Sequence, residues 1–126
     1  MIKVLVFIKK RPDLDRDQFR DYYERNHAPL VNRLLPFYQE YNRNYLVEPF
    51  RPDQTGVDFD VVTELVFASR DDYEAWRATL AEPAVLEQIR ADERNFLEQG
   101  STRMWLVDEH ADDLPDRLGG ERSATS

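Results

Sequence analysis

The chain is organised around Phe19-Arg-Asp-Tyr-Tyr-Glu-Arg-Asn-His-Ala-Pro-Leu30. Phe19, Tyr23 and His27 recur at every fourth position, which places them on one face of a helix. We predict that the helix ends at about His27, because Pro29 has no amide hydrogen and disfavours α conformation in the residue before it. An imidazole at a helix C-terminus, beside two tyrosines, is the strongest candidate for proton transfer. The alternative is a structural histidine that caps the helix carbonyls.

The composition limits the classes of partner and chemistry. The 126 residues carry a net charge of −8 and include no cysteine. This length suits one domain, and the acidic balance leads us to expect neither nucleic acid nor a membrane as partner. Without cysteine, disulfides, thiolate catalysis and Cys-ligated metal sites are excluded. The apolar N-terminus is too short to span a bilayer and lacks a signal-peptide cleavage site, so the expected location is cytoplasmic.

Alternating hydrophobicity and turn residues predict strands at 2–9, 37–47, 59–67 and 102–107. Helices are expected after the N-caps Asp15 and Ser69, with Pro83 restarting the second helix and Gly100 ending it. The order β-α-β-β-α-β predicts an α+β fold, a four-stranded antiparallel sheet with both helices on one face. No segment is left to cover the other sheet face, so we expect a homodimer packed sheet against sheet.

The sequence predicts one domain at 1–110, followed by a flexible acidic C-terminal tail at 111–126. The tail holds two adjacent glycines, several acids and few apolar residues.

Glu64 is the second candidate for acid–base chemistry. Strand alternation puts it on the same face as Val62 and Val66, where apolar surroundings would raise the pKa of its carboxyl. The alternative is an ion pair with an arginine on a neighbouring strand, such as Arg43 or Arg103. On the strand at 37–47, Asn44 could orient a ligand or the imidazole, or could be an ordinary edge amide.

Aromatic side chains supply candidates for substrate binding. Tyr22, Tyr23, Tyr41 and Tyr45 could donate hydrogen bonds to a phenol or carbonyl oxygen, and all four also suit core packing. Trp76 is a candidate for the wall of a ligand cavity, again with core packing as the alternative.

Four stretches, in this order along the chain, are typical of one known family: Val4–Pro12, Phe19–Leu30 with its His27-Ala-Pro-Leu, Phe59–Phe67, and Asp92–Leu97 followed by Glu109-His110. Together they resemble the EthD family of dimeric α+β-barrel proteins, over residues 1–110. The resemblance implies a ferredoxin-like domain paired into a barrel, with a pocket between sheet and helices. Some fungal relatives act in aromatic polyketide pathways as cofactor-free dehydratases or decarboxylases.

The resemblance therefore implies a cofactor-independent lyase or isomerase acting on an aromatic or polyketide-like small molecule. His27 would be the general acid or base, with Glu64 or Tyr23 polarising a carbonyl or assisting the leaving group. Residues expected to bind the substrate are Tyr22, Tyr41, Asn44 and Trp76. Two alternatives are a cofactor-free monooxygenase of the same fold and a non-catalytic binder that assists a pathway.

We expect no metal and no organic cofactor. Four glycines form no phosphate-binding loop, and His27 and His110 lie too far apart in the sequence to form a paired-histidine metal site. A haem would need one of these two histidines as its axial ligand. We expect His110, near the tail, to lie in solvent.

Overall fold

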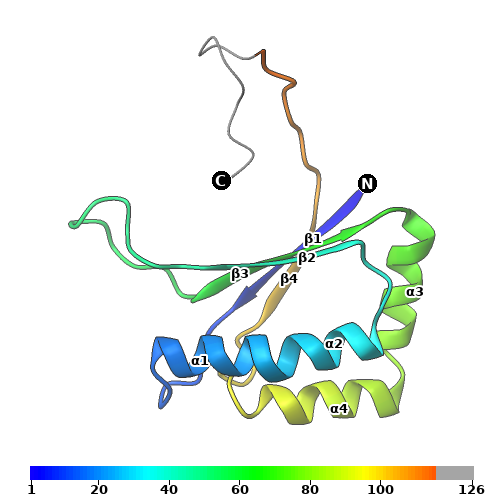
Figure 1. Ribbon diagram of the computed structural model, residues 1–126, viewed down its shortest axis with the longest axis horizontal. Coiled ribbons are helices and arrows are strands. Elements are labelled where there is room, and N and C mark those ends of the chain that lie inside the picture. Colours follow the sequence, from blue (N-terminus) through cyan, green and yellow to red (C-terminus); the bar gives the residue numbers. More distant parts are fainter. Residues whose placement is uncertain (116–126) are drawn as a thin grey trace.

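The computed structural model describes residues 1–115 as an antiparallel sheet lying over a layer of helices (Figure 1). The strands are arranged in the order β2-β3-β1-β4. This is the ferredoxin-like fold that the sequence predicts. The elements are β1 (Ile2–Ile8), α1 (Arg16–Tyr22), the π-helical turn η1 (Tyr23–His27), α2 (Ala28–Leu34), β2 (Glu40–Tyr45), β3 (Val61–Phe67), α3 (Arg70–Leu80), α4 (Pro83–Glu93) and β4 (Arg103–Val107).

The strand β1 lies between β3 and β4, as its apolar content on both faces predicts. Side chains alternate between the two faces of a strand, so Val4, Val6 and Ile8 point together toward the helices, where all three are buried. Opposite them on β3, Leu65 and Thr63 point to the same side. The face that carries these residues is called the inner face below.

The first helix does not end at Pro29, so that prediction is wrong. It continues through η1 into α2, and Figure 1 draws α1 and α2 as one helical rod. The amide of Ala28 donates to the carbonyl of Tyr23, five residues earlier, which widens the helix for one turn. We attribute the tolerance of Pro29 to this widening, because the ring of a proline otherwise clashes with the carbonyl four residues before it.

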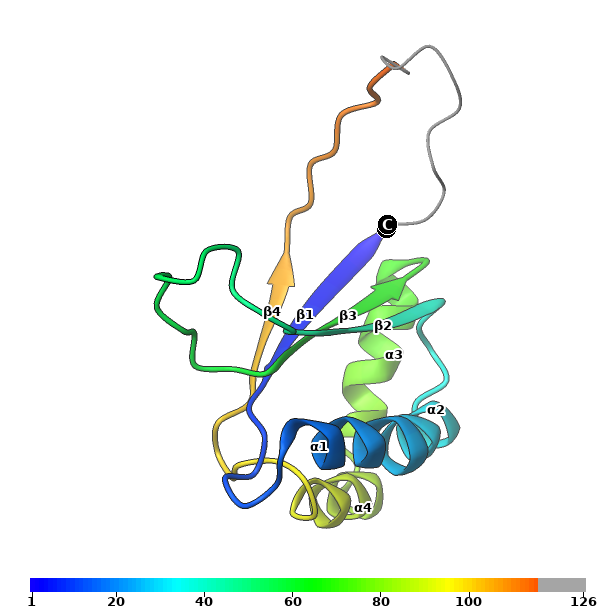
Figure 2. The same ribbon diagram turned by 60° about the vertical axis from the view of Figure 1, so that its left-hand side comes forward.

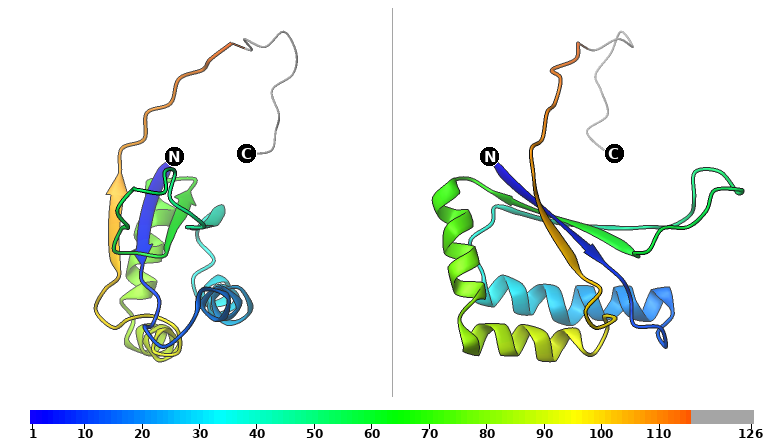
Figure 3. Two further views of the ribbon diagram at one scale, coloured as in Figure 1. Left: turned by 90° about the vertical axis from the view of Figure 1, so that its left-hand side faces the viewer. Right: turned by 180° about the vertical axis from the view of Figure 1, so that it is seen from behind.

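In the helical layer the continuous rod of α1 and α2 lies beside α4 beneath the sheet, as the end-on view in Figure 3 shows. Helix α3 stands steeply between the sheet and this layer, which Figure 2 shows from a second side. Its predicted N-cap is confirmed, because the Ser69 hydroxyl accepts a hydrogen bond from the Asp72 amide at 3.1 Å. The capping box of α1 between Asp15 and Gln18 is also present.

The second predicted helix is α3 followed by α4, and α4 ends at Glu93, earlier than the predicted stop at Gly100. Phe96 and Leu97 leave the helix and are buried in the core. Their segment runs beside the residues that follow β1, where the Arg11 amide donates to the Phe96 carbonyl at 2.8 Å. The chain then turns at Gly100, whose φ of +74° is the left-handed conformation that glycine adopts most easily.

The outer face of the sheet, away from the helices, is covered by no described element. Leu5 and Phe7 are half-buried there, and Trp105 is 64% exposed. Of the predicted tail, residues 111–115 belong to no helix or strand, and residues 116–126 lie outside the described part of the chain. No helix formed by the described residues is long and apolar enough to cross a membrane.

Candidate active site

The imidazole of His27 is held by a carboxylate from the other half of the chain. His27 is the last residue of η1 and only 5% exposed, and its Nδ1 lies 2.8 Å from Oδ2 of Asp92 on α4. A carboxylate can only accept hydrogen bonds, so Nδ1 carries the proton and Nε2 carries the lone pair. Within residues 1–115, Nε2 has no hydrogen-bond partner.

The Asp92 carboxylate is itself fixed on both oxygens. While Oδ2 faces the imidazole, Oδ1 accepts the hydroxyl proton of Tyr22 at 2.6 Å. The Tyr22 oxygen in turn accepts from the Asn95 side-chain amide at 2.8 Å. Tyr22 therefore acts on His27 through Asp92, and it is not one of the residues that line the cavity described below.

The buried site keeps the imidazole neutral. Burial lowers the pKa of His27 below its ordinary value of 6.5, and this effect outweighs the opposing influence of Asp92. No helix C-terminus favours the charged form at His27, because the helix continues to Leu34. At neutral pH the ring is accordingly a base with a free lone pair on Nε2.

His27 borders a small cavity between the helices and the inner face of the sheet. The cavity volume is about 60 Å³, enough for the reacting end of a molecule but not for a whole polycyclic one. Most of its wall is aliphatic or aromatic. The polar side chains on the wall are His27, Tyr23, Tyr41, Thr63, Glu93 and Thr102.

A chain of hydroxyl groups crosses one side of this cavity. Tyr41 donates to the Tyr23 hydroxyl at 3.1 Å, and the Tyr23 hydroxyl lies 2.9 Å from that of Thr63. Either hydroxyl of the Tyr23–Thr63 pair can be the donor of that hydrogen bond. Burial raises the pKa of both tyrosines, so they are neutral hydrogen-bonding groups at physiological pH.

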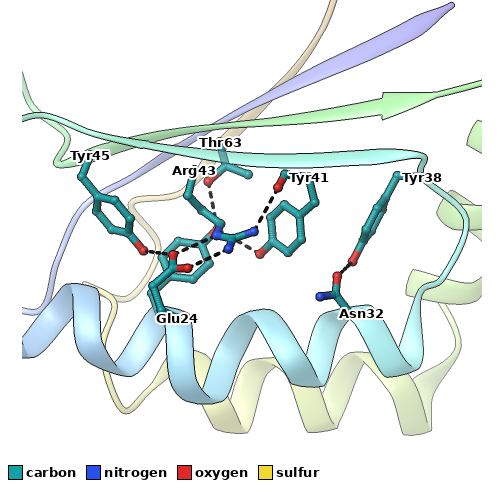
Figure 4. Close-up of polar contacts among 8 residues, drawn as sticks. Glu24, Asn32, Tyr38, Tyr41, Arg43, Tyr45 and Thr63 are labelled. Atoms are coloured by element: carbon teal, nitrogen blue, oxygen red, sulfur yellow. Dashed lines mark hydrogen bonds and ion pairs between the residues drawn. The ribbon is translucent and has the colours of Figure 1, made fainter. Parts of the chain in front are cut away.

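Arg43 links the π-helical turn to the edge strand β2 (Figure 4). Its guanidinium makes two parallel bonds to the Glu24 carboxylate, at 2.8 and 2.7 Å, and it lies 4.5 Å from the centre of the Tyr41 ring. Tyr45 donates to the same carboxylate at 2.6 Å. The guanidinium holds the pKa of Glu24 below its ordinary value. This cluster fixes Tyr41, and with it the hydroxyl chain, against η1. Outside this cluster, the Tyr38 hydroxyl donates a hydrogen bond to the side-chain oxygen of Asn32.

A family model described as the EthD domain matches residues 11–100, well over half of the chain. The chain belongs to the EthD family. The conidial pigment biosynthesis dehydratase EthD of Metarhizium robertsii is 24% identical over 108 residues, which cover 77% of this chain and 74% of that protein.

Two solved structures are similar to this EthD-family chain in fold. An ethyl tert-butyl ether D (EthD) family protein from Bacillus halodurans has a TM-score of 0.60 at 17% identity, covering 87% of this chain and 100% of that chain. A dimeric protein of ferredoxin-like fold from Bacteroides fragilis has a TM-score of 0.55 at 12% identity, covering 86% of this chain and 95% of that chain.

Glu64 and Asn44 lie on the outer face, away from His27. Strand alternation correctly places Glu64 on one face with Val62 and Val66, but the expected rise in the pKa of Glu64 is wrong. Lys3 Nζ lies 3.0 Å from Oε1 of Glu64 and Asn44 donates to Oε2 at 3.1 Å, and the two contacts lower that pKa. The cation is a lysine of β1 rather than either arginine named from the sequence. Asn44 therefore orients Glu64, not the imidazole.

The remaining candidates divide between the cavity and the surface. Tyr23, Tyr41 and Trp76 line the cavity with His27. Trp76 is 5% exposed, and its indole Nε1 is buried with no hydrogen-bond partner among residues 1–115. His110 is exposed, as expected, and pairs with Asp108 at 2.9 Å.

Sequence reasoning assigned no role to Asp92 and Glu93. The signal that could have found them is helical spacing, because both lie within one turn of Ile89 on the helix whose apolar face includes Val85 and Leu86. Acids at positions where a core residue is expected indicate a polar function beneath the sheet. An imidazole fixed by such an acid at an apolar cavity supports a catalytic or binding role toward a small molecule.

Proposed function

We propose that this protein is a cofactor-independent lyase, acting on an aromatic or polyketide-like small molecule, in which His27 is the general base. The observation that carries the proposal is the buried, neutral imidazole that Asp92 orients on the cavity wall. A general base needs a pKa near the working pH and a lone pair within reach of the substrate.

The arrangement supports abstraction of a proton next to a carbonyl group. Nε2 accepts the proton, and Asp92 then stabilises the imidazolium through the Nδ1–H bond, as an orienting carboxylate does for other catalytic histidines. The apolar wall strengthens this interaction by excluding water. The hydroxyls of Tyr23, Tyr41 and Thr63 offer the substrate oxygen polar contacts on the same wall.

Among lyase reactions, loss of water is favoured by the relative from Metarhizium robertsii, whose name describes a dehydratase. Dehydration of a β-hydroxy ketone begins with the proton abstraction described above. Decarboxylation and isomerisation use the same kind of proton transfer, so they are the alternatives within the proposal.

The proposal is tested with a simple β-hydroxy ketone, the aldol of benzaldehyde and acetone. Its dehydration gives the conjugated enone benzylideneacetone, which is followed by ultraviolet absorbance. We expect turnover by the wild type, none by His27→Ala, and full turnover by the matched surface variant His110→Ala. Alizarin, a hydroxylated anthraquinone, serves as the binding probe, and its affinity should survive in His27→Ala.

Three outcomes contradict the proposal. Equal turnover in His27→Ala and wild type would show that His27 is not the general base. Consumption of dissolved oxygen during turnover would instead favour the cofactor-free monooxygenase. Binding of alizarin without any turnover of the β-hydroxy ketone, and without exchange of its α-protons with deuterated solvent, would favour a non-catalytic binder.

The proposal includes a homodimer joined through the outer sheet face. Leu5, Phe7 and the exposed Trp105 form an apolar surface there, and the similar Bacteroides fragilis protein is described as dimeric. In analytical ultracentrifugation, Trp105→Glu should sediment as a monomer while the helix-surface control Ala91→Glu stays a dimer. A monomeric wild type at high concentration would contradict this part of the proposal.

A further inference from the structure

Glu93 is a second acid on the wall of the cavity that His27 borders. It follows Asp92 directly on α4 but is turned about 100° around the helix axis. Asp92 reaches the imidazole, whereas Glu93 lines the cavity, as do Thr102 and Met104. The Glu93 side chain is half-buried, and within residues 1–115 it makes no hydrogen bond or ion pair.

Burial affects the pKa of Glu93 more strongly than the charged groups around it do. Arg90, one turn earlier on α4, favours the carboxylate, and the neighbouring charge of Asp92 disfavours it. His27, which lines the same cavity, is neutral at physiological pH. The net result is a pKa for Glu93 above its ordinary value of 4.5, with burial as the main cause. The protonated carboxyl is a hydrogen-bond donor and a proton source.

We infer that Glu93 is the general acid that protonates the leaving hydroxyl group while His27 removes a carbon-bound proton. The inference rests on the proposed function and specifies it as a dehydration. Two groups that line one cavity and whose pKa values are displaced in opposite directions, the imidazole toward its neutral form and the carboxyl toward its protonated form, are suited to this division of roles.

The elimination balances in atoms and charge. Nε2 of His27 takes the proton from the carbon next to the ketone, and the C–H electron pair becomes the new C=C bond. The adjacent C–O bond breaks, and the Glu93 carboxyl gives its proton to the leaving oxygen, which departs as water. The imidazolium proton then returns to the Glu93 carboxylate through solvent, which restores both groups.

An apolar groove next to the cavity supplies room for the rest of the substrate. Its volume is about 340 Å³, and it shares Trp76, Leu80 and Met104 with the wall of the cavity. On the groove side, Leu86 and the exposed Leu106 extend the apolar surface. The substrate class that fits is an aromatic body in the groove, carrying a β-hydroxy ketone that reaches into the cavity.

Trp76 supports this orientation of the substrate. It borders both spaces, and its buried indole N–H has no acceptor among the described residues. A buried donor without a partner destabilises the unliganded protein, and a substrate oxygen that accepts from it removes that penalty.

The test compares Glu93→Gln, which keeps the shape of the side chain, with Glu87→Gln on the exposed side of the same helix. With the benzaldehyde–acetone aldol as substrate, kcat of Glu93→Gln should fall about a hundredfold to ten-thousandfold with little change in KM. Glu87→Gln should match the wild type, and Glu93→Asp should recover part of the lost rate.

The pH profile gives a readout that a structural role would not produce. Wild-type kcat/KM should rise as His27 loses its proton and fall as Glu93 loses its proton, and Glu93→Gln should lack the falling limb. An unchanged profile and rate in Glu93→Gln, while His27→Ala is inactive, overturns the role of Glu93 and leaves the proposed function standing. Activity retained in His27→Ala overturns both.

A measurement without turnover decides the same point independently. Carbon-13 NMR of glutamate-labelled protein should show the Glu93 carboxyl titrating above the ordinary glutamate value. Titration of Glu93 at or below the ordinary glutamate value overturns the inference, whatever the substrate.

Discussion

Glu64 on the outer face of the sheet and Glu93 beneath its inner face are both half-buried, but their pKa values move in opposite directions. Glu64 contacts the ammonium group of Lys3 at 3.0 Å, and its pKa falls. Glu93 contacts no cation, and its pKa rises. Partial burial therefore does not by itself indicate an acid–base residue, because the presence of a cation decides the sign.

The largest expected effect lies on the inner side, at the carboxylate that orients His27. In Asp92→Asn the amide can donate to Nδ1, which favours the tautomer with the proton on Nε2 and removes the base. We expect kcat for the β-hydroxy ketone to fall about a hundredfold or more while the protein stays folded. The exposed Asp71→Asn is the control, and a kcat equal to the wild type in both variants would contradict the role of Asp92.

The second-largest expected effect is a loss of stability when the cluster of Arg43, Glu24 and Tyr45 is broken. Arg43→Met removes both bonds to Glu24 and leaves its carboxylate with only the Tyr45 hydroxyl. We expect the free energy of unfolding to fall by about 1–2 kcal/mol, a value reduced for the partial solvent exposure of the pair. Urea denaturation measures this loss. Arg20→Met, which removes an exposed pair with Asp17, should change stability much less, and equal losses would contradict the account.

The smallest effect lies on the outer face. Lys3→Met removes the cation from Glu64, and we expect a loss of about 0.5–1 kcal/mol because solvent screens the pair. The folded-state pKa of Glu64 is lowered, so this stabilisation is present above the unfolded pKa and is lost as pH falls through the folded value. The stability difference between wild type and variant should therefore shrink in acid. A difference that grows in acid would contradict the ion pair.

Local patterns predicted most of the elements and named several residues of the cavity wall, but not the acids beside His27. The alternation in β1 and the caps Asp15 and Ser69 depend on neighbouring residues, and the structure confirms them. The effect of Pro29 was misjudged, because a π-helical turn accommodates the proline and the helix runs on to Leu34.

The partner of His27 could not be found by local reasoning. Asp92 lies 65 residues away in the sequence and meets the imidazole only because α4 packs beside η1. Glu64 shows a second limit of local reasoning. Alternation correctly put it on one face with Val62 and Val66, but could not show that Lys3 of β1 lies next to it. Contacts between distant segments, rather than the residue types themselves, decide which acids are paired.

The most direct test of the central claim is nitrogen-15 NMR of the histidine rings across a pH titration, with the exposed His110 as the internal comparison. The account predicts that His27 at neutral pH is uncharged, with the proton on Nδ1 and the lone pair on Nε2, and that its pKa lies below the ordinary histidine value. An imidazolium at neutral pH, or a neutral ring protonated on Nε2, would contradict it.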